Sequence, residues 1–190
     1  MVKKTSEGLV KYAIKQIGMP VWYDTFGQLA SESLYNEMIS KYSGRYYNPF
    51  FDYRFHYGLK VHYGIGLIKG YMWSENADDP NPKYCSNGCP NIDIKTMYNS
   101  AKLKGRMPFL MPDVPGICVL NYYSDRIGVY VGNGYVIEAR GPRGVKIEEL
   151  NDSYWTHWCY CPYIEYNINK LNEKEKEKVE LLWKISQQRD

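Results

Sequence analysis

The chain has 190 residues, of which 44% are hydrophobic, 24% charged and 16% aromatic. This length and composition fit one compact globular domain and exclude an intrinsically disordered chain or a low-complexity array. A formal net charge of +3 is too small to indicate a nucleic-acid partner, and we expect none. The 20 tyrosines fit a partly wet groove or binding face, because the tyrosine ring is apolar and its hydroxyl is polar, and the codon bias of an AT-rich genome is an equally good explanation.

The N-terminal residues, from Met1 to Glu7, turn polar at once, and no apolar segment typical of a secretory signal follows them. No run of about 18 apolar residues offers a membrane span. We therefore expect a cytoplasmic protein. Five cysteines in such a chain predict mostly reduced thiols and no disulfide framework.

Apolar residues at helical spacing dominate the first half of the chain. The expected helices cover about residues 7–17, 28–42, 64–74 and 94–104. Thr5 and Ser6 can cap the first of them. The aromatic segment 46–57 shows no clear period, and we expect it to pack as a cluster that flanks a groove.

Short apolar segments separated by Gly, Pro and Asn dominate the second half. The expected strands cover residues 117–120, 127–131, 135–139, 145–147 and 160–164. Helices followed by antiparallel strands predict an α+β domain.

The turn at Asn133–Gly134 decides which residues share a face of its hairpin. A two-residue loop would place Val129 opposite Glu138 and mix charge into the apolar face. A three-residue loop, 132–134, would place Val129 opposite Ile137. We prefer this second register, because it gives one consistently apolar face. The opposite face would then carry Arg126, Gly128, Tyr130, Val136 and Glu138, with an ion pair between Arg126 and Glu138.

Three segments carry a resemblance to a known family. They are residues 18–28 (GMPVWYDTFGQ), 61–71 (VHYGIGLIKGY) and 126–141 (RIGVYVGNGYVIEARG). Together they resemble the NlpC family of bacterial and phage cell-wall cysteine peptidases, in particular its signal-less endolysin branch. The likeness implies a papain-like NlpC-type domain over residues 1–166, with N-terminal helices packed on a small antiparallel sheet. It also implies that phage-style lysis could release the protein.

The resemblance fails at the catalytic positions. The family mechanism needs a cysteine thiolate at the start of the central helix, a histidine base on the facing hairpin and a third residue that orients the base. The matching positions hold Gly64, Arg126 and Glu138. A guanidinium stays protonated near neutral pH and cannot act as a base. The aspartate before the family cysteine is Tyr63, and the tyrosine that helps to hold the oxyanion is Val21.

These substitutions favour a pseudoenzyme, because losing a nucleophile or its base alone costs roughly a million-fold in turnover in well-studied triads. We expect the former active-site groove to bind a peptidoglycan stem peptide or a protein partner. The alternative is an active peptidoglycan endopeptidase or amidase with unconventional catalytic residues. The expected groove residues are Val21, Trp22, Tyr23, His62, Tyr63 and Tyr130.

Two pairs of cysteines invite a zinc interpretation. The pairs are Cys85 with Cys89 and Cys159 with Cys161. The one-residue spacing of the second pair would put its thiols on opposite faces of a strand. Free thiols are therefore preferred, with one disulfide between Cys85 and Cys89 if the protein reaches an oxidising space. We expect no metal and no cofactor.

The C-terminal segment 167–190 predicts a charged helix with an apolar end. Its apolar residues Val179, Leu182 and Trp183 can pack back on the domain or mediate self-association. Both interpretations stay open at the level of sequence.

Overall fold

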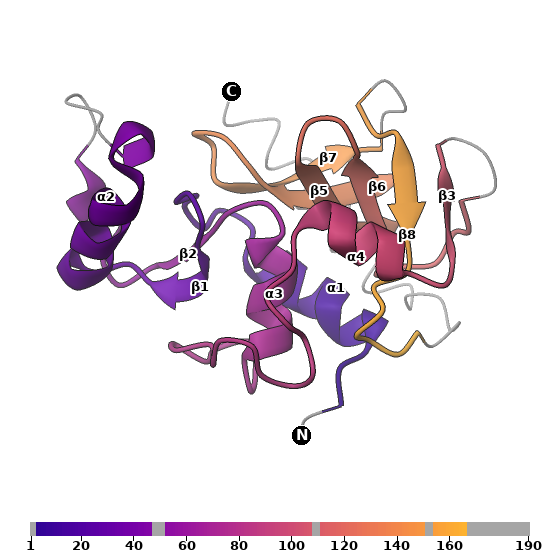
Figure 1. Cartoon of the computed structure of the whole chain (residues 1–190), viewed down its shortest axis with the longest axis horizontal. Helices are drawn as coiled ribbons and strands as arrows, with labels where there is room; N and C mark the ends of the chain where they lie inside the picture. Colours follow the sequence, from indigo (N-terminus) through magenta and orange to yellow (C-terminus); the bar gives the residue numbers. More distant parts are fainter. Residues whose placement is uncertain (1–2, 47–51, 108–110, 151–153, 167–190) are drawn as a thin grey trace.

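The computed structural model of the chain describes residues 3–46, 52–107, 111–150 and 154–166 (Figure 1). Its helices are α1 (Ser6–Lys15), α2 (Glu32–Tyr46), the 3-10 helix η1 (Tyr53–His56), α3 (Gly66–Trp73) and α4 (Ile94–Ser100). Its strands are β1 (Phe26–Leu29), β2 (Lys60–His62), β3 (Lys104–Arg106), β4 (Cys118–Asn121), β5 (Arg126–Gly132), β6 (Tyr135–Ala139), β7 (Val145–Glu149) and β8 (His157–Cys159). Helices that precede an antiparallel sheet confirm the predicted α+β class.

The architecture is a layer of helices on one antiparallel sheet. Six strands form this sheet in the order β3-β8-β4-β5-β6-β7, and β1 pairs with β2 in a separate two-stranded sheet. The main core lies between α1, α3 and the inner face of the large sheet, while alternate residues of the same strands form a second core on the outer face. In Figure 1, β1 and β2 lie between α3 and α2, which stands at one end of the molecule.

Helix α1 forms as the sequence predicts. The Thr5 hydroxyl accepts a hydrogen bond from the Gly8 amide at 3.1 Å and caps the first turn. Leu9, Val10 and Ala13 are fully buried on the face that meets the sheet. Its N-terminal cap and its buried apolar face therefore both stabilise this helix.

The β5–β6 hairpin combines the two loop registers considered above. Along most of its length Val129 lies opposite Ile137, as the three-residue loop predicts. A β-bulge then shifts the pairing by one residue, so that Gly132 lies opposite Tyr135. The tip is the two-residue turn Asn133–Gly134, in which both residues have positive φ (53° and 79°). The bulge keeps the apolar face intact and still allows the favoured tight turn.

The helix expected over residues 28–42 starts too early, and this prediction is wrong at its N-terminal end. Residues Phe26–Leu29 form β1 and pair with β2, which was not predicted. Ser31 caps α2 by accepting a hydrogen bond from the Leu34 amide at 3.2 Å, so the helix begins only at Glu32. Strand pairing with a distant segment has overridden the local helical spacing.

Two further boundaries differ from the sequence prediction. The helix expected over 94–104 ends at Ser100, because Lys104–Arg106 extend and pair with β8. The strand expected over 160–164 is wrong, because β8 covers His157–Cys159 and the chain leaves the sheet before Pro162. Pro cannot donate a ladder hydrogen bond, which disfavours a central strand at that position.

The expected C-terminal helix over residues 167–190, with Val179, Leu182 and Trp183, lies outside the described residues. The division into a domain over 1–166 and a C-terminal helix therefore stays a prediction.

Candidate functional site

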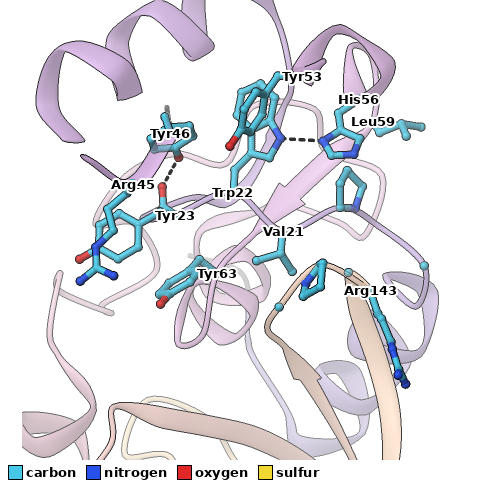
Figure 2. A pocket seen from close by; sticks show the side chains of 15 residues that line it. Val21, Trp22, Tyr23, Arg45, Tyr46, Tyr53, His56, Leu59, Tyr63 and Arg143 are labelled. Carbon is cyan, nitrogen blue, oxygen red and sulfur yellow. Dashed lines mark hydrogen bonds between the residues drawn. The ribbon is translucent and has the colours of Figure 1, made fainter. Parts of the chain in front are cut away.

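A groove of about 470 Å³ lies between the α2 end of the molecule and the turn that joins β6 to β7 (Figure 2). Its size is within the usual range of ligand sites. It is lined by Gly18, Pro20, Val21, Trp22, Tyr23, Arg45, Tyr46, Tyr53, His56, Leu59, Tyr63, Gly141, Pro142, Arg143 and Gly144. Of the groove residues expected from the sequence, the structure brings together Val21, Trp22, Tyr23 and Tyr63.

The aromatic wall of the groove is fixed by Trp22, which is 1% exposed. Its indole N–H donates to Nδ1 of His56 at 2.8 Å (Figure 2). Its ring makes edge contacts with Tyr46 and Tyr53 at centroid distances of 6.1 and 5.5 Å. Burial lowers the pKa of His56, so the ring is neutral at pH 7 and carries its proton on Nε2. The wall is thus a preorganised aromatic surface.

Two arginines flank this wall (Figure 2). The Arg45 guanidinium lies over the ring of Tyr23, with 5.1 Å between its Cζ and the ring centroid. Tyr23 also contacts Tyr63 at a centroid distance of 4.8 Å. Arg143 belongs to the β6–β7 turn on the opposite side of the groove. The aromatic wall therefore lies between two exposed cations.

His62 does not line the groove, although the sequence suggested it. Its side chain is completely buried behind β2, and its Nε2 lies 3.2 Å from the Gln16 side-chain oxygen. The ring meets Tyr12 edge-on at 5.9 Å. Burial, together with the nearby charge of Lys60, lowers the pKa of His62 to about 3. His62 is therefore a neutral core residue at physiological pH.

This burial predicts a loss of stability in mild acid. The unfolded chain gains a proton on His62 below about pH 6.5, whereas the folded chain does not until about pH 3. Stability from this residue is present above pH 6.5 and declines as the pH falls. We expect the protonation of His62 in the unfolded chain to lower the free energy of unfolding by about 2 kcal/mol between pH 7 and pH 5. Urea unfolding of the wild-type protein and of His62→Gln at both pH values tests this, because the variant should show a pH dependence smaller by that amount.

Tyr130 was also expected in the groove, and the structure places it elsewhere. Its side chain belongs to the outer core of the sheet with Trp155. The Tyr130 hydroxyl donates to Asp113 at 2.6 Å and accepts from the Gly134 amide at 3.2 Å. Burial raises its pKa to about 12. Tyr130 thus holds the hairpin tip against the Asp113 segment.

Gly64 occupies the turn that leads into α3. Its φ of 50° lies in the left-handed region. Its N–H donates to the Ala139 carbonyl at 2.8 Å, which holds this turn against the end of β6. A Cβ atom placed there would meet no heavy atom within 4 Å. The position is open but carries no functional group, and its backbone favours glycine.

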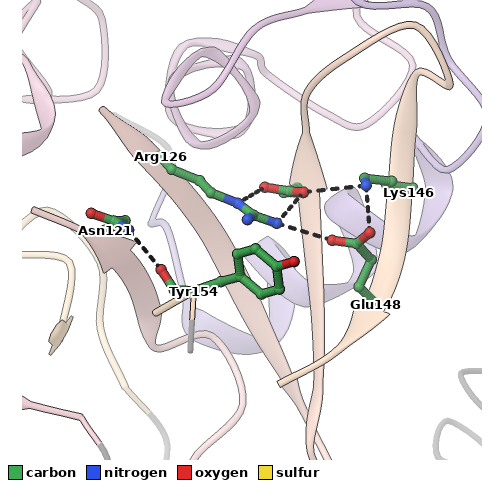
Figure 3. A network of polar contacts seen from close by, with 6 residues as sticks. Asn121, Arg126, Lys146, Glu148 and Tyr154 are labelled. Carbon is green, nitrogen blue, oxygen red and sulfur yellow. Dashed lines mark hydrogen bonds and ion pairs between the residues drawn. The ribbon is translucent and has the colours of Figure 1, made fainter. Parts of the chain in front are cut away.

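The predicted ion pair between Arg126 and Glu138 is confirmed (Figure 3). Nε and Nη2 of Arg126 donate to the two carboxylate oxygens, each at 2.7 Å. Nη2 also donates to Glu148 at 3.1 Å, and the ammonium of Lys146 lies 3.6 Å from Glu138. Glu138 is 1% exposed, whereas Arg126 is 14% exposed. Two cations and two carboxylates thus form one network on β5, β6 and β7.

Arg126 cannot act as a base in this network. Burial lowers the pKa of Arg126, but its bonds to Glu138 and the charge of Glu148 outweigh burial and raise it above the usual value. The guanidinium also covers the ring of Trp155, with 4.6 Å between Cζ and the ring centroid. Arg126 is therefore a fixed cation, and none of Gly64, Arg126 or Glu138 lines the groove.

The cysteines are free thiols, including Cys85 and Cys89. Cys118, Cys159 and Cys161 lie in the main core together, because β8 ends at Cys159 and the expected alternation of faces does not apply. Hydrogen bonds with the other two thiols and burial raise the pKa of Cys118 well above its usual value. Such a thiol is a poor nucleophile near neutral pH.

Within the described ranges, no three His, Cys, Asp or Glu side chains come together in a way that could hold a metal ion. Of the helices in this part of the chain, none is both long and apolar enough to cross a bilayer.

Several groove residues were not identified from the sequence as site residues. The sequence did not identify Arg45 or Arg143, because neither lies in a segment that carries the family resemblance. Tyr53 and His56 belong to the aromatic segment that was expected to flank a groove. The part of that segment at residues 47–51 lies outside the described residues.

Comparison with known proteins finds a likeness to a solved structure. No protein-family model matches the sequence, and no curated protein matches it. The fold is similar to that of the peptidoglycan hydrolase RipB from Mycobacterium tuberculosis, at 17% sequence identity and a TM-score of 0.44. The alignment covers 85% of this chain and 65% of that one, so this chain spans less than two thirds of the RipB structure.

Proposed function

We propose that this protein is a catalytically inactive NlpC-type homologue that binds a peptide in its aromatic groove. The bidentate Arg126–Glu138 pair is the observation that carries the proposal. A general base must be unprotonated near neutral pH so that it can accept a proton. A guanidinium held by a buried carboxylate stays protonated and cannot do this.

The turn at Gly64 supports the same conclusion. Nucleophilic catalysis needs a thiol, hydroxyl, amine or carboxylate at the reacting position, and glycine has none. Its left-handed φ of 50° would cost a cysteine there about 1 kcal/mol or more. The chain around residue 64 is therefore shaped for glycine and not for the side chain that the family mechanism requires.

The groove supports a binding role. Aromatic rings that are already fixed in place bury ligand area without losing side-chain freedom on binding. Tyr23 contacts both Arg45 and Tyr63, and Tyr63 is 36% exposed. Trp22 is held by His56 and supports this wall from the interior, because it is itself buried. The ligand in this proposal is a peptidoglycan stem peptide or a segment of a protein partner. A cytoplasmic location, with release by phage-style lysis, stays an expectation from the sequence.

Digestion of purified peptidoglycan tests the absence of catalysis. We expect the wild-type protein to release no new amino groups over a buffer control, while an active peptidoglycan hydrolase run in parallel does. Mass spectrometry of the soluble products checks this result. Sustained turnover that disappears in Glu138→Gln would contradict the proposal and favour the alternative of an active endopeptidase or amidase.

Binding is tested separately by co-sedimentation with the same peptidoglycan and by titration with its soluble stem peptides. We expect Tyr63→Ala to weaken binding, because Tyr63 lines the groove. Tyr123→Ala is the matched control, since Tyr123 is 78% exposed and does not line the groove. Equal binding by both variants would place the ligand elsewhere.

A further inference from the structure

Strand β3 forms an open edge of the large sheet. It pairs with β8 on one side, and no described strand lies on its other side. In Figure 1 it stands at the end of the molecule opposite α2, and none of its residues lines the groove. An open sheet edge can add a strand from another chain, because its outward main-chain groups have no partner in the sheet.

The pairing with β8 shows which main-chain groups of β3 point outward. Tyr160, directly after β8, donates its amide proton to the Leu103 carbonyl at 2.9 Å. Main-chain groups alternate between the two sides of a strand, so those of Gly105 also face β8. The amides and carbonyls of Lys104 and Arg106 therefore point away from the sheet.

Positive charge accompanies these outward groups. The side chains of Lys104 and Arg106 are exposed and share one face of the strand. Gly105 lies between them and faces the other way, since a Cβ atom added there would be 2.8 Å from the Trp158 ring. Lys102 adds a third exposed cation in the bend that leads into β3. The edge thus presents main-chain donors and acceptors beside three cations.

Lys104 is oriented by neutral groups. Its ammonium donates to the Tyr98 and Asn99 carbonyls, at 3.2 and 2.7 Å. It also lies over the Tyr98 ring, with 5.1 Å between Nζ and the ring centroid. These contacts fix the position of the ammonium and leave its positive charge in place.

Within the described ranges, no Asp or Glu forms an ion pair with any of the three cations. Asp93 precedes β3 in the sequence, and its charge acts on two lysines outside this strand. The charge of Asp113, which follows β3, acts on the Tyr130 hydroxyl. Asp125 lies beyond β8 and β4, in the turn before β5. The described charges along this edge are therefore positive.

The sign and position of the charges decide which strand fits. Exposed lysines on a short edge strand prevent indiscriminate pairing. Two copies of β3 would place like charges opposite each other, which is destabilising. A strand with carboxylates at alternate positions would place opposite charges across the pair.

From these observations we propose that the outer edge of β3 adds an extended acidic segment of a partner protein as a further strand. The main chain of Lys104 and Arg106 supplies the hydrogen bonds of this added pairing. Carboxylates at alternate positions of the segment pair with Lys102, Lys104 and Arg106. This surface is separate from the aromatic groove, and the proposal goes beyond the function assigned to that groove.

Fluorescence anisotropy with labelled peptides tests the proposal. The acidic peptide is acetyl-Thr-Glu-Val-Glu-Val-Glu-Thr-amide, and two matched peptides carry Gln or Lys in place of every Glu. We expect the acidic peptide to bind about tenfold more tightly than the Gln peptide, the effect of three exposed charge pairs. The Lys peptide should not bind. An acidic peptide that is N-methylated throughout keeps its charges but cannot donate main-chain hydrogen bonds, and it should bind at least about tenfold more weakly than its parent.

Amide hydrogen exchange followed by NMR locates the bound peptide. Saturation with the acidic peptide should slow exchange of the Lys104 and Arg106 amides by about tenfold or more, because both gain hydrogen-bond partners. The Met107 amide is the internal control, since it already donates to the Thr156 carbonyl at 2.9 Å.

Variants identify the charges responsible. Lys102→Gln combined with Arg106→Gln should reduce the preference for the acidic peptide over the Gln peptide to about twofold. Arg140→Gln is the matched control, because Arg140 is an exposed cation directly after β6. Thermal unfolding checks that these variants remain folded.

Equal binding of the acidic and Gln peptides overturns the proposal, as does equal binding of the N-methylated peptide or unchanged exchange at Lys104 and Arg106. A dimer of the free protein in which both amides are protected would make a second copy the occupant and would also overturn it. Protection of both amides in the free monomer would show that another part of the chain covers this edge, with the same consequence. These results leave the peptidoglycan assays unaffected, because those assays probe the groove.

Discussion

Replacing Arg126 with methionine is expected to lower the free energy of unfolding by about 3 kcal/mol at pH 7. The substitution leaves Glu138 buried, with 1% of its side chain exposed, and removes both hydrogen bonds that satisfy its carboxylate. Lys146 remains 3.6 Å away and compensates in part, which places the effect at the lower end of the range for broken buried pairs. Urea unfolding followed by circular dichroism measures the change.

The pH dependence of this loss of stability tests whether the unpaired charge of Glu138 causes it. In the wild-type protein burial already raises the pKa of Glu138, and Arg126 opposes this shift. Without Arg126 the pKa should rise further, so the folded state takes up a proton more readily than the unfolded state. A carboxyl with a raised folded-state pKa destabilises the protein above its unfolded pKa, and this penalty disappears as the pH falls. The difference in unfolding free energy between the wild-type protein and Arg126→Met should therefore be smaller at pH 5 than at pH 7.

Two further variants complete this test. Arg126→Met combined with Glu138→Leu should recover most of the lost stability, because no buried charge is then left unpaired. Arg140→Met, at an exposed arginine directly after β6, should change the free energy of unfolding by about 0.5 kcal/mol or less. If Arg126→Met is as stable as the wild-type protein at pH 7, the network has no structural role.

Replacing Gly66 with alanine is expected to destabilise the fold by about 3 kcal/mol or more. Helix propensity alone predicts a gain of about 1 kcal/mol at a helical glycine. The tertiary structure reverses this sign, because the added Cβ would lie 1.9 Å from the Thr25 carbonyl oxygen. That contact is with the backbone of the segment leading into β1, which cannot move without disturbing the β1–β2 pairing. Thermal unfolding measures the effect.

Gly44 provides the matched control for this prediction. It lies in α2, and a Cβ atom there would meet no heavy atom within 4 Å. We expect Gly44→Ala to be neutral or stabilising by about 0.5–1 kcal/mol. Equal effects of the two substitutions would show that β1 does not pack closely on α3.

Local patterns in the sequence were sufficient for the elements whose partners are near in the chain. The cap at Thr5 and the apolar face of α1 identify that helix. The β5–β6 hairpin is similar, because a tight turn fixes which residues face each other. Arg126 and Glu138 are 12 residues apart, and the predicted register places them on one face, where they form the observed ion pair.

Elements that depend on distant segments were not predictable in this way. Gln28 and Leu29 fit a helical pattern, yet they belong to strand β1, because β2 supplies the hydrogen bonds from about 30 residues away. The boundaries of β8 likewise depend on its pairing with both β3 and β4. Intrinsic preferences are weak, and hydrogen bonds in a sheet outweigh them.

The sequence by itself determined the α+β class and the aromatic character of the groove, because both follow from residue types and short spacings. The loss of a catalytic base is what the family resemblance implies, and it belongs to the proposed function. Only the tertiary structure decided which side chains line the groove. It excluded His62 and Tyr130, which point into the interior and to the outer face of the sheet. It added Arg45 and Arg143, which come from segments far apart in the chain. Side-chain direction depends on packing between distant elements, and local sequence does not encode that packing.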